Sequence, residues 1–301
     1  MLCMNPQEQE KKYYFNMTGI RVIGVIGAGT MGSGIAAASA VNGFKTLLFD
    51  IYPQALEKAK GSILKGYDKL LEKGKLDAAK HKAAEENLVI VNSLEELKDC
   101  DIIIEAAIED IKLKKELYSK LDEISKPDAI LATNTSSFSI TSISTAVKNN
   151  PGRVIGMHFF NPANIMKLVE VIKGSFTSSE TADTVTDLCR KLGKVPVLCA
   201  DTPAFIVNRV ARAFYGESLK IMGEENKDAG FIDEIMKEEG GFAMGPFELM
   251  DLIGIDINLS VTKSVYEAFF YDQKYKPSPI QQKMVDSGLL GRKTKQGFYK
   301  Y

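Results

Sequence analysis

The fold is decided by Arg21-Val22-Ile23-Gly24-Val25-Ile26-Gly27-Ala28-Gly29-Thr30-Met31-Gly32, close to the start of the chain. This apolar run leads directly into glycines spaced as GxGxxG, and an alanine-rich helical pattern follows at residues 32–42. A second apolar run, residues 45–49, ends at Asp50. A strand, a glycine turn, a helix and a strand in this order predict a βαβ unit that binds a dinucleotide.

The spacing gives each glycine a separate task. Gly27 permits the tight turn, Gly29 lets the backbone approach a pyrophosphate, and Gly32 lets the helix pack closely on the strand. The helix N-terminus then presents its N–H groups and the positive end of its dipole to the phosphates. The predicted cofactor loop therefore consists of Gly27, Ala28, Gly29, Thr30, Met31 and Gly32.

Asp50 indicates which dinucleotide binds. It stands 18 residues after Gly32, where a carboxylate can accept hydrogen bonds from the ribose hydroxyls. The same charge would repel a 2′-phosphate, so we expect NAD rather than NADP. A flavin-binding unit and a purely structural glycine turn remain the alternatives at this point.

Composition excludes several other classes of function. The 301 residues are 45% hydrophobic and 26% charged, with a net charge of −1, so there is no global charge to attract nucleic acid or an anionic membrane. No apolar run approaches the roughly 20 residues of a membrane-spanning helix. We expect neither nucleic acid nor a membrane as a partner.

The cysteines and histidines give no metal-ligand pattern. The sequence has two histidines and no CxxC pair, so we predict no metal site and free thiols in a reducing cytoplasm, with His81 at the surface; the four cysteines are Cys3, Cys100, Cys189 and Cys199. Residues 1–19 lack both the apolar core of a signal peptide and the arginines of a transit peptide. We expect them to be a flexible leader.

The first two thirds of the chain alternate strand and helix patterns, which predicts a doubly wound α/β sheet of the Rossmann type over residues 20–200. The strand-like runs are apolar, as expected of strands covered on both faces. They cover residues 21–26, 45–49, 88–91, 101–105, 129–133, 154–159 and 166–172. The helical patterns cover residues 32–42, 53–73, 112–125, 139–147 and 179–192.

The pattern changes at Asp201-Thr202-Pro203, where Asp201 or Thr202 is a suitable N-cap and Pro203 suits a first helical turn. Only helical patterns follow, so we predict a smaller all-α domain over residues 201–301. The helical patterns cover residues 204–222, 232–240, 245–255, 259–271 and 278–287.

Polar side chains at predicted strand ends are the candidates for chemistry, because ligands of open α/β sheets bind at the carboxyl ends of strands. His158 ends an apolar strand, and Glu170 lies twelve residues later between valines, where an unpaired carboxylate would be costly. A His–Glu pair suits general acid–base catalysis, since the carboxylate fixes the tautomer of the ring. The alternative is a structural histidine with Glu170 on a solvated edge.

Two further polar residues have an equally ordinary alternative. Ser137, after the strand at 129–133, could bind a substrate oxygen, but serine and threonine runs are also common in turns. Asn208 lies among apolar residues of a predicted helix and could reach a cleft between the domains. A helix-surface asparagine is the alternative.

Together these segments resemble the L-3-hydroxyacyl-CoA dehydrogenases, and among them the stand-alone bacterial 3-hydroxybutyryl-CoA dehydrogenases. The resemblance runs in order from about residue 20 to the C-terminus. It is carried by Gly27–Gly32, Glu105-Ala106-Ala107-Ile108-Glu109, Asn134–Ser137, His158–Pro162, Lys167–Ile172, Asp201–Arg209, Met244–Leu249 and Gly297-Phe298-Tyr299.

The resemblance implies roles for individual residues. His158 would be the catalytic base of oxidation, Glu170 its orienting partner, and Ser137 and Asn208 would lie beside the reacting oxygen. Lys73 matches a position that contacts coenzyme A, whereas a serine position of the family is Gly66 here, which puts one contact to the thioester handle in doubt. The positions that would contact NAD, besides the glycine loop and Asp50, are Glu109, Lys114, Asn134, Ser137, Asn161 and Lys293.

The expected function is the NAD-dependent interconversion of (S)-3-hydroxyacyl-CoA and 3-ketoacyl-CoA, most readily 3-hydroxybutyryl-CoA and acetoacetyl-CoA, by a homodimer that associates through its second domain. One rival is a sugar-acid dehydrogenase of the gulonate 3-dehydrogenase type, which shares the His–Glu pair. The lysines of the helix through Lys65, Lys69 and Lys73 favour a phosphorylated handle instead. The other rival is a non-catalytic relative such as a lens crystallin.

Overall fold

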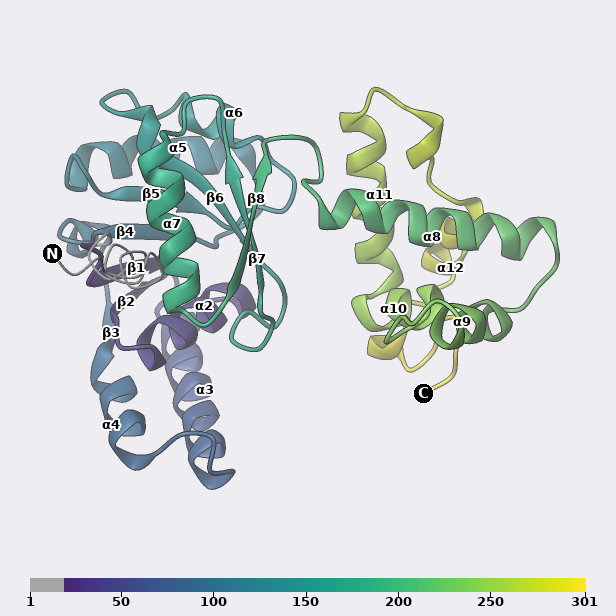
Figure 1. The fold of residues 1–301 in the computed structure, drawn as a ribbon, viewed down its shortest axis with the longest axis horizontal. Coiled ribbons are helices and arrows are strands. Elements are labelled where there is room, and N and C mark those ends of the chain that lie inside the picture. Colours follow the sequence, from purple (N-terminus) through teal and green to yellow (C-terminus); the bar gives the residue numbers. More distant parts are fainter. Residues whose placement is uncertain (1–18) are drawn as a thin grey trace, which may run out of the picture. The chain divides into compact units, whose positions relative to one another are not determined.

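A computed structural model describes residues 19–301, which form two compact units. The first unit ends at Asp201 and the second covers Thr202–Tyr301. Residues 1–18 of the predicted leader, Cys3 included, lie outside the described residues. The α/β class of the first unit and the all-α class of the second are confirmed (Figure 1).

The first unit is built on one eight-stranded sheet with the strand order β3-β2-β1-β4-β5-β6-β7-β8. Strands β1 to β6 are parallel, β7 is antiparallel to β6, and β8 is parallel to β7. The order reverses direction between β1 and β4, and a ligand of such a sheet binds at this switch point. The strands are β1 (Val22–Ile26), β2 (Lys45–Phe49), β3 (Leu88–Val91), β4 (Ile102–Glu105), β5 (Ile130–Thr133), β6 (Val154–Phe159), β7 (Leu168–Lys173) and β8 (Val195–Ala200).

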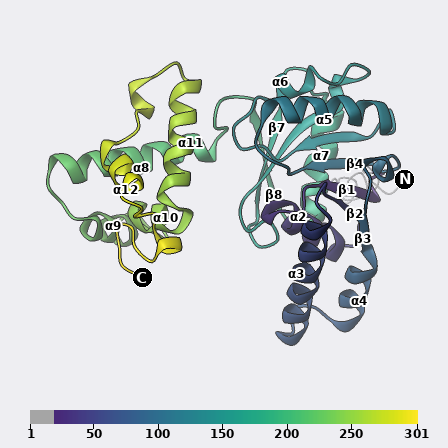
Figure 2. The same ribbon diagram turned by 180° about the vertical axis from the view of Figure 1, so that it is seen from behind.

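Helices cover both faces of this sheet, with α7 on one face and α5 and α6 on the other (Figures 1 and 2). The α2 and α7 side packs the main core, in which alternate residues of the central strands such as Ile23, Val25 and Ile104 are fully buried. Helices α3 and α4 form a hairpin that extends beyond the sheet (Figure 1). The helices are α2 (Thr30–Val41), α3 (Pro53–Glu72), α4 (Ala78–Asn87), α5 (Ile111–Ile124), α6 (Ile140–Ser144) and α7 (Ser179–Lys191).

The second unit packs its helices around a core that includes Phe247, Met250 and Ile255. Its C-terminal segment adds Phe298 and Tyr299 to that core. Its helices are α8 (Val207–Glu224), α9 (Ala229–Glu238), α10 (Pro246–Ile253), α11 (Ile255–Ala268) and α12 (Pro279–Asp286). Across residues 19–301, no helix has the length and apolar character needed to cross a membrane.

One predicted detail is wrong, and two elements were not predicted. Neither Asp201 nor Thr202 caps the helix that follows, because α8 begins only at Val207; the Asp201 carboxylate instead accepts the N–H groups of Ile140 and Thr141 in the first turn of α6. Strand β8 was not predicted, because Pro196 interrupts its otherwise apolar run and a proline disfavours a strand. Helix α4 was missed because its composition is almost entirely polar or alanine.

Candidate active site

Apart from Lys73, the predicted site residues of the first unit gather at one edge of the sheet. Strands β1, β4, β5 and β6 run parallel, so the segments that follow them leave the sheet at the same edge. These segments are the glycine loop at 27–32, residues 106–109, residues 134–137, and residues 160–161 next to His158. The topology therefore brings together groups that lie more than 100 residues apart in the sequence.

The glycine loop has the geometry that dinucleotide binding requires. Gly27 has a φ of +101°, and a side chain on Gly32 would clash with the carbonyl oxygen of Gly27. At Gly29, by contrast, a Cβ would meet no protein atom within 4 Å, so packing does not explain this glycine, whereas close approach of a phosphate does. No acidic side chain in the first turn of α2 would repel that phosphate. The loop fits the pyrophosphate of NAD.

Asp50 lies next to this loop. One carboxylate oxygen of Asp50 accepts the Ala28 N–H at 2.7 Å, and the other accepts the Tyr52 N–H at 2.9 Å. The carboxylate thus ties the end of β2 to the loop and is half-buried. It remains acceptor-only while ionised, as recognition of ribose hydroxyls requires.

His158 and Glu170 form a direct pair across the two antiparallel strands β6 and β7. The Nδ1 of His158 lies 2.7 Å from Glu170 Oε2, and the two side chains are 8% and 1% exposed. An ionised carboxylate only accepts hydrogen bonds, so Nδ1 donates and a neutral ring carries its lone pair on Nε2. Such a ring is arranged to take up and return a proton through Nε2.

Two other contacts hold the loop after β6. The carboxamide oxygen of Asn134 accepts the Phe159 N–H at 2.8 Å, which joins the ends of β5 and β6. The ammonium of the buried Lys194 donates to the carbonyl oxygens of Ala163 and Met166 at 2.6 and 2.9 Å. The predicted contact residue Asn161 is exposed in this loop, between the two anchored points.

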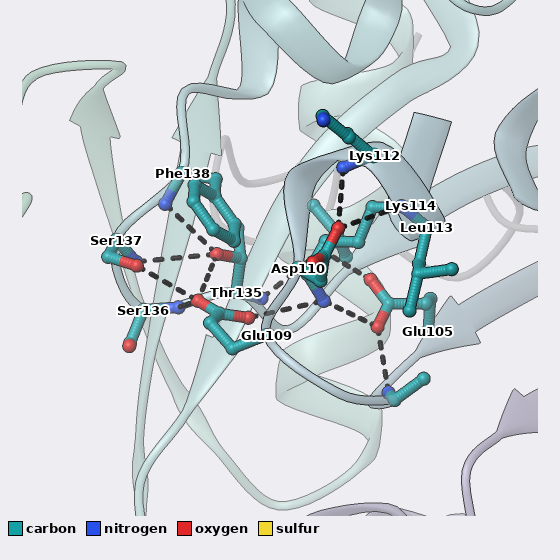
Figure 3. Close-up of polar contacts among 12 residues, drawn as sticks. Glu105, Glu109, Asp110, Lys112, Leu113, Lys114, Thr135, Ser136, Ser137 and Phe138 are labelled. Carbon is teal, nitrogen blue, oxygen red and sulfur yellow. Dashed lines mark hydrogen bonds and ion pairs between the residues drawn. The ribbon is translucent and has the colours of Figure 1, made fainter. Parts of the chain in front are cut away.

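Ser137, Glu109 and Lys114 belong to one polar network at the ends of β4 and β5 (Figure 3). Glu109 accepts the hydroxyl of Ser137 at 3.0 Å, and its other oxygen lies 3.2 Å from the Lys114 ammonium. Burial by itself would raise the pKa of Glu109, but the charge of Lys114 and the surrounding hydrogen bonds outweigh it and lower this pKa. Glu109 is therefore an ionised acceptor at neutral pH.

The remaining predicted positions lie elsewhere. Lys73 caps the C-terminal end of α3, on the exposed face that also carries Lys65 and Lys69, as their four-residue spacing requires. Asn208 and Lys293 belong to the second unit, where Lys293 pairs with Asp256 at 2.6 Å. Their roles stay predictions.

His81 is less exposed than predicted. Its side chain is only 14% exposed and its Nε2 lies 2.9 Å from Asp68, which joins α4 to α3. Because α4 itself was not predicted, no partner was expected for this histidine. It belongs to the helical hairpin and not to the sheet edge.

The predictions overlooked Glu105, the most buried charged group of the site. It is 0% exposed at the end of β4 and lies 2.6 Å from the ammonium of Lys114. A signal was available in the run Ile102-Ile103-Ile104-Glu105, because a carboxylate that ends an apolar strand needs a partner. Glu170, which lies between valines in β7, has the same need for a partner.

Comparison with protein families agrees with this geometry. Residues 22–202 match the model of the 3-hydroxyacyl-CoA dehydrogenase NAD-binding domain, and residues 205–301 match the C-terminal domain of the same family. The predicted resemblance and the predicted cofactor, NAD, are thereby confirmed.

Individual relatives extend over almost the whole chain. The 3-hydroxybutyryl-CoA dehydrogenase of Clostridioides difficile is 44% identical over 93% of this chain and 99% of its own length. The 3-hydroxyadipyl-CoA dehydrogenase of Escherichia coli is 43% identical over 94% of this chain, which spans only 59% of that longer protein. The crystal structure of (S)-3-hydroxybutyryl-CoA dehydrogenase from Ralstonia eutropha has a TM-score of 0.90, with 40% identity over 94% of this chain and 99% of that one.

Proposed function

The chain belongs to the 3-hydroxyacyl-CoA dehydrogenase family, and we propose that it interconverts short-chain (S)-3-hydroxyacyl-CoA and 3-ketoacyl-CoA, with NAD as the hydride carrier. The observation that carries the proposal is the buried pair of His158 and Glu170 at the sheet edge that also carries the glycine loop. The proposed preference for short acyl groups rests on the stand-alone 3-hydroxybutyryl-CoA dehydrogenases, which this protein matches over nearly their full length.

His158 is assigned the proton transfer. In oxidation, Nε2 takes the proton of the C3 hydroxyl, and Glu170 stabilises the imidazolium that forms. In reduction, the imidazolium returns a proton to the developing alkoxide. Bound NAD supplies the hydride acceptor or donor, held through the glycine loop and Asp50.

Other residues are assigned binding roles. Ser137 and Asn208 hold the reacting oxygen, and Glu109, Lys114, Asn134, Asn161 and Lys293 contribute to the NAD site. The exposed lysine face of α3, Lys73 included, attracts the phosphates of coenzyme A. We further propose a cytoplasmic homodimer that associates through residues 202–301, which a solution mass equal to one chain would contradict.

The direct test follows NADH oxidation with acetoacetyl-CoA in the parent protein and in His158→Gln. Removal of a general acid–base group typically lowers the rate by about 100- to 10,000-fold, so turnover should collapse while NADH still binds. A near-normal kcat in the variant would remove His158 from the mechanism. A rate series from C4 to C16 ketoacyl-CoA then tests the chain length.

Two rivals are decided by the same assay. A gulonate-type dehydrogenase would oxidise gulonate and ignore acetoacetyl-CoA. A non-catalytic relative would fail to oxidise NADH, whichever ketoacyl thioester is added. The intact His158–Glu170 pair argues against the second rival, because a buried pair of this kind carries a desolvation cost that a purely structural protein does not need.

A further inference from the structure

Glu105 stands at the buried end of a chain of contacts that reaches Ser137. It is completely buried, and its two oxygens accept three donors: the Lys114 ammonium at 2.6 Å, the Ala107 N–H at 2.7 Å and the Thr133 hydroxyl at 2.7 Å. These donors come from α5, the segment after β4, and β5. Glu105 therefore joins three elements that meet at the sheet edge.

Lys114 passes this constraint on to Glu109. Its side chain is only 2% exposed and lies between the two carboxylates, 2.6 Å from Glu105 and 3.2 Å from Glu109 (Figure 3). A buried ammonium needs a counter-charge, and the fully buried Glu105 fixes the place at which Lys114 can be neutralised. Lys114 in turn holds Glu109, which is 40% exposed, through the ion pair at its buried end.

Glu109 in turn orients the turn that carries Ser137. A single oxygen of Glu109 accepts the Thr135 hydroxyl at 2.6 Å, the Ser136 N–H at 3.1 Å and the Ser137 hydroxyl at 3.0 Å. Thr135 also accepts the N–H groups of Ser137 and Phe138. Because a serine has one O–H, its donation to Glu109 determines where the lone pairs of Ser137 point.

We propose that Glu105 is a positioning residue, which acts through Lys114 to hold Glu109 and, through Glu109, the hydroxyl of Ser137 in one arrangement. Lys114 is then chiefly the link between the two carboxylates. The inference rests on the proposed function only for the meaning of Ser137 in catalysis. The arrangement itself concerns the NAD site and is testable by cofactor binding alone.

The first variant is Glu105→Gln, which keeps the shape of the side chain and a carbonyl oxygen but removes the charge opposite Lys114. Lys114 then has Glu109 as its remaining carboxylate and draws it away from the turn. Misplacement of a positioned group typically lowers the rate by on the order of 10- to 100-fold. With Glu109 displaced from the turn, we expect the NADH Kd to rise or kcat to fall by about that factor. Fluorescence titration with NADH measures binding without any acyl substrate.

The matched control is Asp122→Asn. Asp122 is also a buried carboxylate of the first unit, paired with the buried Arg153 at 2.7 Å, but it contacts none of the network residues. If loss of a buried ion pair were the whole effect, both variants would lose stability in urea and neither would change the NADH Kd. We expect only Glu105→Gln to change NADH binding or kcat.

A double-mutant cycle with Lys114→Met tests whether Glu105 acts through Lys114. In a single linked path the effects of Glu105→Gln and Lys114→Met do not multiply, so the double variant should bind NADH about as weakly as the weaker single variant. If the changes in NADH Kd of the two single variants multiply in the double variant, the proposal is overturned. It is also overturned if Glu105→Gln stays within twofold of the parent in both NADH Kd and kcat. If Glu105→Gln does not fold, Thr135→Val tests the same chain of contacts. This variant removes one buried hydroxyl and should also raise the NADH Kd.

This design separates the two proposals. If the parent binds NADH but leaves acetoacetyl-CoA unchanged, the proposed function fails and the cycle on NADH Kd still decides the role of Glu105. If the parent turns over acetoacetyl-CoA and the effects in the cycle multiply, the function stands and the linked path fails.

Discussion

The two units of this protein use buried carboxylates in opposite ways. In the first unit, each of three buried carboxylates pairs with a basic side chain of another element: Glu105 with Lys114, Asp122 with Arg153, and Glu170 with His158. In the second unit, within residues 202–301, the two fully buried carboxylates Asp233 and Asp251 have no basic partner.

Backbone N–H groups and tyrosine hydroxyls serve as partners in the second unit. Asp233 accepts the N–H groups of Phe247 and Glu248 at the start of α10 and the Tyr299 hydroxyl at 2.7 Å. Asp251 accepts the N–H groups of Phe298 and Tyr299, both at 3.0 Å. These carboxylates hold the C-terminal segment on the helices.

The difference shows what each kind of partner allows. A backbone N–H does not titrate, and burial together with Asp233 raises the pKa of Tyr299, so these partners stay neutral donors at neutral pH and we assign the carboxylates of the second unit a structural role. A histidine or lysine side chain can exchange a proton or bind a ligand while its carboxylate partner holds it in place. The first unit therefore has its paired carboxylates where chemistry is proposed, with Asp122 as the structural exception.

The largest effect is expected where the partner is a titrating group. In Glu170→Gln the ring of His158 loses its anionic partner, and the imidazolium formed in catalysis is no longer stabilised. We expect kcat with acetoacetyl-CoA to fall by roughly 100- to 10,000-fold with little change in the NADH Kd. A kcat above one tenth of the parent value would mean that Glu170 has a structural role, like the carboxylates of the second unit, and not a catalytic one.

A smaller effect, on stability alone, is expected for Asp122→Asn. Burial opposes ionisation of Asp122, but its hydrogen bond from Arg153 and the N–H groups of Asn149 and Lys148 outweigh this and lower its pKa. The lowered pKa means that the stabilisation is complete above the unfolded value of about 3.9 and is lost as the pH falls through the folded value. The variant should be less stable by about 3 kcal/mol at pH 7.

The pH dependence is the check on that prediction. Urea unfolding of parent and variant should differ most at neutral pH, and the difference should shrink as the pH falls from about 4, where the carboxyl of the unfolded chain takes up a proton, through the lower folded pKa. A difference that stays constant with pH would mean that charge plays no part in the Asp122–Arg153 contact.

The smallest effect is expected in the second unit from Tyr299→Phe. This change removes one of three donors to Asp233 and leaves the two backbone N–H groups in place, so the loss should be about 1.5 kcal/mol. Thermal unfolding measures it. Tyr301→Phe, which removes a longer contact of 3.2 Å to Asp251, is the matched control and should cost less. A changed NADH Kd in either variant would contradict the division between the units.

Local patterns made much of the fold predictable. The periods of apolar residues identified seven of the strands shown here, and the domain change near residue 200 followed from the loss of strand patterns. Helix α4 escaped because a polar helix lacks the apolar stripe on which such predictions depend, and strand β8 escaped because Pro196 interrupts its apolar run. The misassigned cap at Asp201 shows the same limit, since its helix lies sixty residues earlier in the chain.

By itself the sequence determined the dinucleotide loop. The glycines that permit the tight turn, the approach of the backbone to a pyrophosphate and the close packing of helix on strand all lie within residues 27–32. Only the tertiary structure decided the polar partnerships. His158 meets Glu170 through the register of two antiparallel strands, and Glu105 meets Lys114 and Thr133 because β4, β5 and α5 converge at one sheet edge. Such contacts depend on strand order and register, which no short stretch of sequence specifies.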